Sequence, residues 1–332
     1  MKKAATRSIV LAVILLAAVA VKAQAQQSGK VPRVGLLTTA STTMTATWVE
    51  AFRQALREWG YTEGKNIILE IRGGDAKYNQ LPDLAAELVG LKVEVIVAGG
   101  PQAVRAAMKA TKTIPIVMRT GTDPVKAGFV VSLARPGGNV TGVTAMSGNL
   151  VGKQLELLAE VVPGVKRMGV LSPTRNPARF MERDEYKEMA AAARVLGVQL
   201  QLESGTDPGT IDEAFRALTK EHAQALIVTP SPRYLQHRER IIKHATQHRL
   251  PAIYPQGIFV ENGGLMSYAT NYADEFRRAA VYVVKILKGA KAADLPVERP
   301  ITFEFAVNLR AAKEIGLTIP PNVLVRATRV IR

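Results

Sequence analysis

Short apolar runs alternate with amphipathic stretches from residue 31 onward. Residues 34–37 form an apolar run that is typical of a buried strand. Large apolar side chains then recur at helical spacing, at Trp48, Phe52, Leu56 and Trp59. Gly60 ends that predicted helix. Repeated strand–helix alternation of this kind predicts a parallel sheet with helices on both of its faces.

The alternation continues along the chain and then begins again. In the first part it predicts strands at 66–71, 93–98 and 114–118, and helices at 81–91 and through Val104 and Met108. In the second part it predicts strands at 167–171, 198–202, 225–228 and 251–254, and helices at 150–162, 189–196, 211–219 and 235–248. The units 34–97 and 168–228 share the order strand, loop, helix, strand, helix, strand. The sequence therefore predicts an α/β protein with two similar lobes.

The tetrapeptide Gly-Thr-Asp-Pro occurs twice, at 121–124 and 205–208. Thr or Asp can accept hydrogen bonds from the free N–H groups of a first helical turn, and Pro suits that turn. Both copies therefore predict helix starts, and capping alone explains the second copy. The first copy follows the carboxyl end of a predicted strand, where ligands bind in open α/β sheets. For Thr122 and Asp123, capping and ligand contact both remain open.

The N-terminus has the order of a secretory signal peptide. Basic residues come first, an apolar run covers 9–21, and small residues at Ala23 and Ala25 suit a cleavage site. We expect residues 1–25 to be removed, so that the mature chain begins near Gln26. An uncleaved membrane anchor is the alternative, but the apolar run is shorter than the roughly 20 residues that span a bilayer.

Composition narrows the possible chemistry. The 332 residues include no cysteine, which excludes disulfides, thiol nucleophiles, cysteine-based metal sites and a lipidated N-terminal cysteine. About 300 residues remain after cleavage, which allows two lobes of ordinary size. The formal net charge is +16, but the basic residues are scattered. A basic solvated surface is favoured over nucleic-acid binding, and attraction of an anionic solute or an acidic membrane is secondary.

Seven segments, spread in order over nearly all of the mature chain, together resemble one known family. They are residues 121–128, 133–143, 155–167, 263–268, 286–291, 295–298 and 312–321. The resemblance is to the bacterial ABC-transporter substrate-binding protein family that includes tryptophan- and tyrosine-binding members. No single segment is decisive, and the set is specific.

This resemblance implies the type I periplasmic-binding-protein fold, in which two Rossmann-like lobes with parallel sheets are joined by three crossing strands. Lobe 1 is expected at 31–145 plus about 273–303, and lobe 2 at 146–272 plus about 304–332. It also implies delivery of a small-molecule ligand to an inner-membrane permease driven by a cytoplasmic ATPase. We expect a monomer with no cofactor, no metal and no nucleic-acid partner. Many family members carry a lipidation cysteine that this chain lacks, so we expect it free in the periplasm.

A solute held between two such lobes must meet loops at the carboxyl ends of strands on both sides. The candidate ligand-binding residues in these loops are Thr39, Ser41, Thr42, Gly100, Pro101, Gln102, Thr122, Asp123, Thr174, Asn176, Ser231, Tyr254 and Gln256. Hydroxyls and free N–H groups at helix starts suit a carboxylate, and Asp123 could receive an amino group. The alternative for each residue is ordinary turn formation.

Two further sets carry open alternatives. Three tyrosines could stack on a planar solute or pack near a hinge: Tyr254, Tyr268 and Tyr272. Three glycines could absorb hinge rotation at the crossings or simply form turns: Gly142, Gly263 and Gly264.

Other functions find less support in the sequence. His244 and His248 share a helical face and could chelate a metal, but solvated surface histidines are favoured. No nucleophile elbow, Walker loop or dinucleotide fingerprint is present, which argues against an enzyme. A transcription factor of this fold needs a DNA-binding head, and residues 1–30 hold only an export signal. A periplasmic sensor that presents solute to a receptor remains an alternative to a two-lobed transport protein that closes around its solute.

Overall fold

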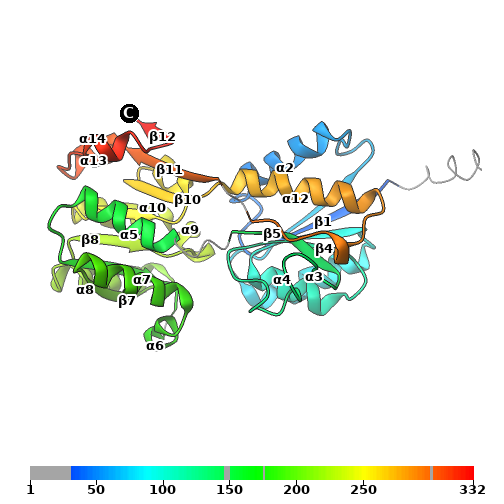
Figure 1. The fold of residues 1–332 in the computed structure, drawn as a ribbon, viewed down its shortest axis with the longest axis horizontal. Coiled ribbons are helices and arrows are strands. Elements are labelled where there is room, and N and C mark those ends of the chain that lie inside the picture. Colours follow the sequence, from blue (N-terminus) through cyan, green and yellow to red (C-terminus); the bar gives the residue numbers. More distant parts are fainter. Residues whose placement is uncertain (1–30, 146–149, 175, 300–301) are drawn as a thin grey trace, which may run out of the picture.

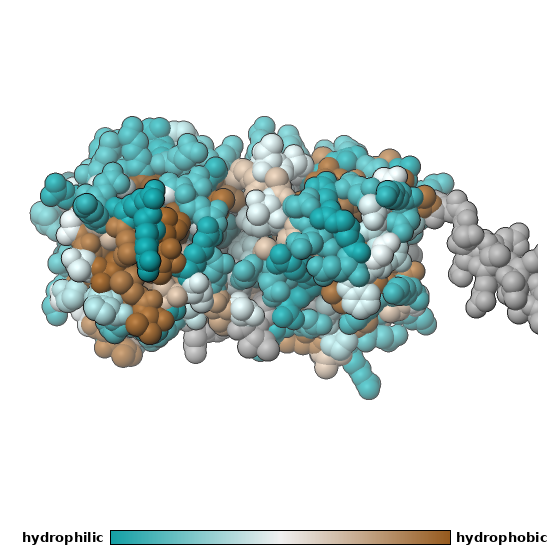
Figure 2. Space-filling view, turned by 90° about the horizontal axis from the view of Figure 1, so that it is seen from above, coloured by the Kyte–Doolittle hydropathy of each residue, from teal (hydrophilic) through white to brown (hydrophobic). Residues whose placement is uncertain are grey.

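The computed structural model describes residues 31–145, 150–174, 176–299 and 302–332, so the predicted signal peptide lies outside the described residues. Two β-sheets with helices on both faces form two bodies that lie end to end (Figure 1). We call the body built on the five-stranded sheet lobe 1 and the body built on the seven-stranded sheet lobe 2. A space-filling view from above shows the two lobes in contact, with apolar residues gathered on the surface of lobe 2 (Figure 2).

The sheet of lobe 1 is entirely parallel. In spatial order its strands are β2 (Ile68–Gly73), β1 (Arg33–Thr38), β3 (Val95–Gly99), β4 (Ile116–Thr120) and β5 (Val140–Thr144). Every neighbouring pair is parallel, so all five carboxyl ends lie at one edge. Continuous apolar runs form these strands because helices bury both faces of the sheet.

Helices from distant parts of the chain cover the two faces of this sheet. One face carries α2 (Ala46–Glu58) and α12 (Tyr272–Leu287), which pack against each other and bury Phe52 and Phe276. The other face carries α3 (Leu81–Gly90) and α4 (Pro101–Ala110). Two short 3₁₀ helices complete the lobe: η1 (Tyr78–Gln80) and η2 (Ala292–Asp294).

The sheet of lobe 2 is mixed. In spatial order its strands are β12 (Arg329–Ile331), β11 (Phe303–Asn308), β10 (Met266–Thr270), β9 (Ala252–Tyr254), β8 (Ala225–Val228), β6 (Arg167–Ser172) and β7 (Gln199–Ser204). The pair β10–β11 is antiparallel and the other pairs are parallel. The carboxyl ends of β6 to β10 therefore share one edge.

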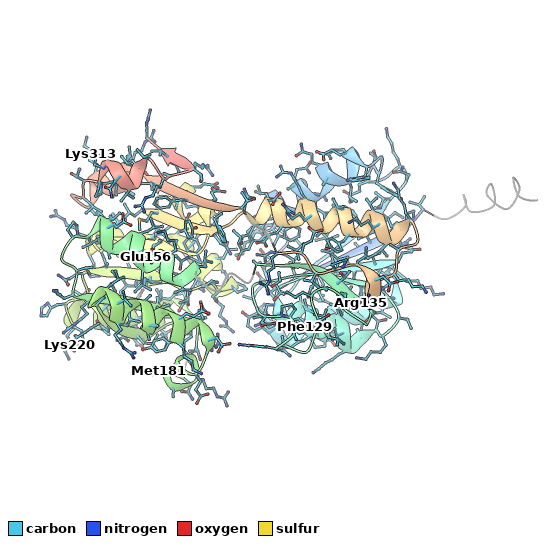
Figure 3. The ribbon with its side chains drawn as sticks, viewed as in Figure 1. Phe129, Arg135, Glu156, Met181, Lys220 and Lys313 are labelled. Atoms are coloured by element: carbon cyan, nitrogen blue, oxygen red, sulfur yellow. The ribbon has the colours of Figure 1, made fainter. Side chains whose placement is uncertain are left out.

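Eight helices lie around the sheet of lobe 2 in the described part of the chain. One face carries α5 (Leu150–Val161), α7 (Asp184–Leu196), α13 (Leu309–Glu314) and α14 (Pro321–Leu324). The other face carries α8 (Pro208–Lys220), α9 (Pro232–Gln236), α10 (Arg238–Gln247) and α11 (Gly257–Glu261). A ninth helix, α6 (Pro177–Met181), projects from the lobe, with Met181 at its end (Figure 3).

The connections between the lobes place the carboxyl edges of the two sheets opposite each other. The chain passes from β5 to α5, from β10 to α12, and from η2 to β11. The first two crossings leave from carboxyl ends of strands. The third enters at Phe303, which pairs with Thr270 at the carboxyl end of β10. All three crossings therefore use the strand edge at which ligands bind in open α/β sheets.

Two helix predictions differ from the structure. The helix expected over 235–248 is two helices, α9 and α10, that are interrupted at His237. Of the two Gly-Thr-Asp-Pro segments, only 205–208 starts a helix, where the Asp207 carboxylate accepts a hydrogen bond from the Thr210 N–H at 3.1 Å. The segment 121–124 leads into turns, because Gly128 in the left-handed region ends the first turn before a helix develops.

Hinge rotation and turn formation were the alternatives for three glycines, and none of the three lies in a segment between the lobes. Gly142 is inside β5 with φ +130°, and a Cβ there would lie 2.2 Å from the carbonyl oxygen of Met118 on β4. Gly263 and Gly264 precede β10 within lobe 2, where Gly264 allows the Tyr254 ring to approach closely. Close packing requires glycine at 142 and 264.

Candidate functional site: the cleft between the lobes

The loops after β1 and β3 meet at the carboxyl edge of lobe 1. Thr39 directly follows β1, is 8% exposed, and lies against Gly100, the residue before α4. The Gly100 N–H donates to the carbonyl of Arg119 at 2.7 Å, which ties the start of α4 to β4. The structure thus brings together Thr39, Gly100 and Pro101, three of the predicted binding residues.

The other predicted residues of the loop after β1 organise a turn. The Ser41 hydroxyl lies 3.0 Å from that of Thr43 and accepts a hydrogen bond from the Met44 N–H at 3.2 Å. The Thr42 carbonyl accepts from the Thr45 hydroxyl at 3.2 Å, and its side chain is exposed. Gln102 is exposed in the first turn of α4.

The loop after β4 is held by its own polar groups. The hydroxyls of Thr120 and Thr122 lie 2.9 Å apart, and the Thr144 hydroxyl donates to the Thr122 carbonyl at 3.1 Å. The Asp123 carboxylate accepts from the N–H groups of Val125 and Lys126 at 2.9 and 3.1 Å. Capping of a turn is therefore the observed role of Asp123.

In lobe 2 most of the predicted residues lie directly before short helices. Asn176 and Ser231 accept hydrogen bonds from the first turns of α6 and α9, respectively, and the Thr174 hydroxyl bonds to the backbone of Asn176 at 3.4 Å. Gln256 precedes α11, is 9% exposed, and its buried Oε1 has no hydrogen-bond partner in the described part of the chain. A buried acceptor without a partner is costly, so this amide needs a donor from elsewhere.

The three tyrosines do not form one stacking wall. Tyr254 is 1% exposed and stacks on Phe259 inside the core of lobe 2. Tyr268 stacks on Phe303 with ring centroids 5.5 Å apart. Tyr272 lies at the start of α12 and belongs to a different cluster. The three tyrosine side chains pack against different helices and strands, and their spacing along the chain does not show this.

That cluster contains a buried ion pair which sequence reasoning missed. Arg119, at the end of β4, pairs with Glu275 on α12, and their side chains are 12% and 0% exposed. The Arg119 guanidinium carbon lies 3.7 Å from the centroid of the Tyr272 ring, a cation–π contact, and Trp48 packs on the same ring at 4.9 Å. Burial is the largest single effect and would lower the pKa of Arg119, but the charge of Glu275, the Tyr272 side chain and the hydrogen bonds to both together outweigh burial and raise the pKa. The cluster fixes the start of α12, directly after a crossing segment.

A pocket of about 180 Å³ lies between the two lobes. Its walls come from one loop of lobe 1 and two segments of lobe 2: Asp75, Ala76 and Lys77, facing Thr206, Asp207, Arg233, Gln236 and His237. None of the thirteen predicted residues lines it. Two of them hold its walls in place, because the Thr39 carbonyl accepts from the Ala76 N–H at 2.8 Å and the Ser231 hydroxyl accepts from the Arg233 N–H at 3.2 Å.

The loop that forms the lobe 1 wall has an unusual backbone. Asp75 and Ala76 have φ values of 48° and 57°, so two successive residues with side chains are left-handed. Each such residue costs about 1–2 kcal/mol. The Gly74 N–H donates to the Thr38 carbonyl at 2.9 Å and, with the bond from Ala76 to Thr39, holds the loop. Strain that is maintained in this way is typical of functional sites.

Two titratable side chains that line this pocket, His237 and Asp207, have different environments. Burial lowers the pKa of His237, and Arg240 and Arg233 lower it further against the opposing effect of Asp207. His237 is therefore neutral at pH 7. Asp207 caps α8, so its carboxylate is already engaged within lobe 2.

A second cavity lies on the outer side of lobe 1, away from the facing edges. It measures about 220 Å³ and is lined by Arg53, Leu56, Arg57, Tyr61, Thr62, Glu63 and Leu69. These residues come from α2, β2 and the loop between them. Because lobe 2 contributes nothing to it, this cavity does not fit a solute held between lobes.

The lobes also touch each other outside this pocket. Lys126 of lobe 1 and Asp184 of lobe 2 form an ion pair of 2.7 Å between exposed side chains. Their hydrogen bond raises the pKa of Lys126 and lowers that of Asp184. Ala40, in the loop after β1, belongs to an apolar cluster whose other buried members, Leu171 and Ile211 among them, come from lobe 2. Polar and apolar contacts between the lobes thus narrow the cleft.

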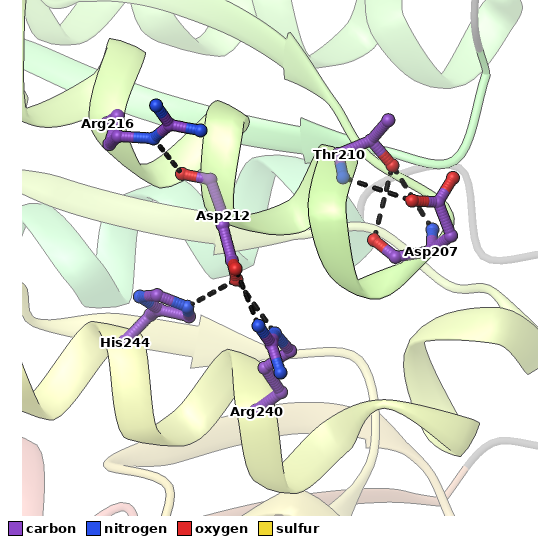
Figure 4. Close-up of polar contacts among 6 residues, drawn as sticks. All are labelled: Asp207, Thr210, Asp212, Arg216, Arg240 and His244. Atoms are coloured by element: carbon purple, nitrogen blue, oxygen red, sulfur yellow. Dashed lines mark hydrogen bonds and ion pairs between the residues drawn. The ribbon is translucent and has the colours of Figure 1, made fainter.

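The histidines that could have chelated a metal are engaged elsewhere. His244 bonds to Asp212 at 2.7 Å, and Arg240 contacts the same carboxylate (Figure 4). The rings of His244 and His248 stack on Phe215. The hydrogen bond from Arg240 is the main cause that lowers the pKa of Asp212. No group of three or more potential metal ligands occurs among the described residues. Within the same residues, no helix has the length and apolarity to cross a membrane.

Two α/β lobes with facing carboxyl edges and a pocket between them define a two-lobed solute-binding protein of the type I periplasmic-binding-protein fold. A family model described as "ABC transporter substrate binding protein" matches residues 34–331. The chain belongs to this family, which is one of binding proteins and not of enzymes. Its place is therefore that of the extracytoplasmic component that hands a small molecule to an ABC transporter.

Individual relatives agree with this assignment. A tyrosine-binding protein of Clostridioides difficile is 26% identical over 268 residues, which are 81% of this chain and 76% of the relative. An ABC domain of Streptococcus pneumoniae in complex with L-Trp matches with a TM-score of 0.81 at 25% identity, over 91% of this chain and 100% of that structure. The ligand-free, open structure of a substrate-binding protein from Clostridium difficile matches with a TM-score of 0.67 at 25% identity, over 91% and 99%.

Proposed function

We propose that this protein binds an α-amino acid, with L-tyrosine and L-tryptophan as first candidates, in the cleft between its lobes. The observation that carries the proposal is the interlobe pocket, whose walls come from both carboxyl edges. The ligands named for the relatives from C. difficile and S. pneumoniae support the choice of ligand class. The loops that contain the thirteen predicted residues are proposed to line the cleft around this pocket.

We further propose that binding is coupled to closure of the lobes. The higher TM-score to the L-Trp complex than to the open relative, at equal identity and equal coverage of this chain, supports a closed arrangement in this structure. The ion pair between Lys126 and Asp184 and the packing of Ala40 into lobe 2 support it as well. A ligand that contacts both lobes binds the closed form more tightly, so it shifts the population toward closure.

The setting of the protein is also a proposal. We propose that residues 1–25 are a cleaved signal peptide and that the mature protein works as a monomer in the periplasm, without catalysing a reaction. The rigid units of the motion are proposed to be 31–145 with about 273–303, and 146–272 with about 304–332. The permease in the inner membrane then recognises the closed form.

The proposal is tested by a thermal-shift screen of the purified mature protein with the twenty amino acids, D-ribose and a nucleoside, followed by calorimetry. A ligand at 100 times its Kd adds about 2.7 kcal/mol of stability, which a melting curve resolves. Scattering in solution should then give a smaller radius of gyration with the ligand than without it. A panel in which D-ribose or a nucleoside stabilises the protein and no amino acid does would overturn the ligand class. An unchanged radius at saturation would overturn closure.

A further inference from the structure

Two side chains of opposite charge face the interlobe pocket from opposite lobes. Asp75 belongs to the loop after β2 in lobe 1, and Arg233 belongs to α9 in lobe 2. Both are only partly exposed. Neither side chain forms a hydrogen bond or ion pair with another residue in the described part of the chain, nor do the two pair with each other. The pocket thus separates a carboxylate from a guanidinium.

The neighbouring charged groups do not neutralise this pair. Asp207 is occupied by the cap of α8, and Lys77 is exposed at the rim. His237 is neutral at pH 7. A half-buried guanidinium without a partner is unfavourable, and the same holds for the carboxylate on the other wall. Both groups are therefore suited to an external partner.

We propose that Arg233 binds the carboxylate of the ligand and Asp75 binds its ammonium group, so that a zwitterionic α-amino acid bridges the two lobes. Arg233 can offer two parallel N–H donors to one carboxylate, which is the strongest arrangement for this pair of groups. Asp75 accepts hydrogen bonds from the ammonium. Because the ligand class comes from the proposed function, the two proposals share a ligand and differ in the residues and groups on which each depends.

The backbone of lobe 1 explains how Asp75 reaches this position. Its left-handed conformation, and that of Ala76, turn the loop after β2 toward lobe 2, and the carbonyls of Thr38 and Thr39 hold it there. On the other wall, the Ser231 cap fixes the first turn of α9, which carries Arg233. Both charges are thus positioned by the strand edges of their own lobes before a ligand arrives.

The arrangement couples charge recognition to closure. A ligand with both charges engages both lobes, whereas a ligand with one charge engages only one wall of the pocket. The structure therefore assigns selectivity for zwitterions to this pair of residues, and it assigns the selectivity to the closed form. Sugars and nucleosides, which carry neither group, gain nothing from the pair.

Calorimetry with three related probes tests each half of the assignment. L-Tyrosine carries both groups, tyramine lacks the carboxylate, and 3-(4-hydroxyphenyl)propionate lacks the amine. For the wild-type protein we expect L-tyrosine to bind at least about tenfold more tightly than either analogue, since a charge-assisted hydrogen bond is worth about 1.5–3 kcal/mol and 1.4 kcal/mol is tenfold.

The variants should respond to the probes in a crossed pattern. Arg233→Met should weaken the binding of L-tyrosine and of 3-(4-hydroxyphenyl)propionate by about tenfold or more and leave the affinity for tyramine unchanged. Asp75→Asn should weaken L-tyrosine and tyramine and leave the propionate unchanged, because asparagine also tolerates a left-handed backbone. Arg238→Met, which removes a guanidinium that bonds to Asn262 outside the pocket, is the matched control and should bind all three probes as the wild type does.

The outcomes separate the two proposals. If L-tyrosine binds the wild type and binds Arg233→Met equally well, with both proteins folded by circular dichroism, the assignment of the carboxylate to Arg233 is wrong while the proposed function stands. If every variant loses all three probes together, the residues act on the fold and not on the ligand. If the wild type binds no amino acid, the ligand class and this assignment both fail.

Discussion

The buried pair between Arg119 and Glu275 should contribute strongly to the stability of lobe 1. Glu275 is fully buried, and Arg119 is covered on one side by the ring of Tyr272. Replacing Glu275 by Leu removes the partner and leaves a guanidinium in an apolar surrounding. The second carboxylate oxygen of Glu275 has no partner among the described residues, so the charge pair is the main polar interaction that is lost.

The magnitude follows from the exposure of the two groups. Breaking a buried ion pair by removing one partner costs about 3–5 kcal/mol, because the remaining charge is uncompensated. Arg119 retains 12% exposure, so we expect the lower end of this range, about 3 kcal/mol, for Glu275→Leu. The double variant Arg119→Met/Glu275→Leu has no charge left to solvate. It should lie within about 1 kcal/mol of the wild type.

Urea unfolding followed by tryptophan fluorescence is a suitable assay. The chain has two tryptophans, Trp48 and Trp59, and both belong to α2 or its end, so the signal reports lobe 1. The reasoning would be refuted if Glu275→Leu lowered the free energy of unfolding by less than about 1 kcal/mol, or if the double variant were less stable than the single one. Either result would mean that water reaches the pair and supports its charges.

Further predictions concern closure, packing and pH. Lys126→Glu should favour the open form, because it places two negative charges at the contact with Asp184, and Lys126→Glu/Asp184→Lys should restore closure. Scattering in the presence of ligand measures the radius of gyration of both variants. Equal radii of gyration for the single and double variants would contradict this. Gly142→Val should destabilise the protein by about 2 kcal/mol or more in urea unfolding, because its Cβ would strike a backbone carbonyl and its φ is strained; near-wild-type stability would contradict the packing. Because the folded-state pKa of Asp212 is lowered, its ionised form stabilises the fold above pH 4 and this contribution disappears as the pH falls below 4. Asp212→Asn should therefore be less stable than wild type at pH 7 and closer to it near pH 3, and a constant difference would exclude the linkage.

Most strands were predictable because of how a parallel sheet is buried. Runs such as 34–37 and 225–228 lie under helices on both faces, so they are continuously apolar and stand out from amphipathic neighbours. The α/β class and the two sheets follow from that contrast. The break at His237 was not predictable, since apolar side chains continue at helical spacing on both sides of it.

The site was harder to predict because its residues come together only in the fold. Arg119 and Glu275 are 156 residues apart, and nothing local marks them as a pair. Asp75 has a left-handed backbone only because the carbonyls of Thr38 and Thr39 hold its loop, and no glycine stands at that position to signal it. The predicted residues Thr39 and Ser231 follow from the rule that ligands bind at the carboxyl ends of strands. They do not line the pocket, but they accept hydrogen bonds from two residues that do, Ala76 and Arg233.

The position of α12 has a consequence for the order of folding during synthesis. Phe276, Ala279 and Tyr282 complete the core of lobe 1, yet they follow β10 of lobe 2 in the chain. A nascent chain that ends at Thr270 would leave the α2 side of the first sheet without its cover. Although N-terminal units usually fold first as a chain emerges, here the first lobe must wait until most of the second has been made.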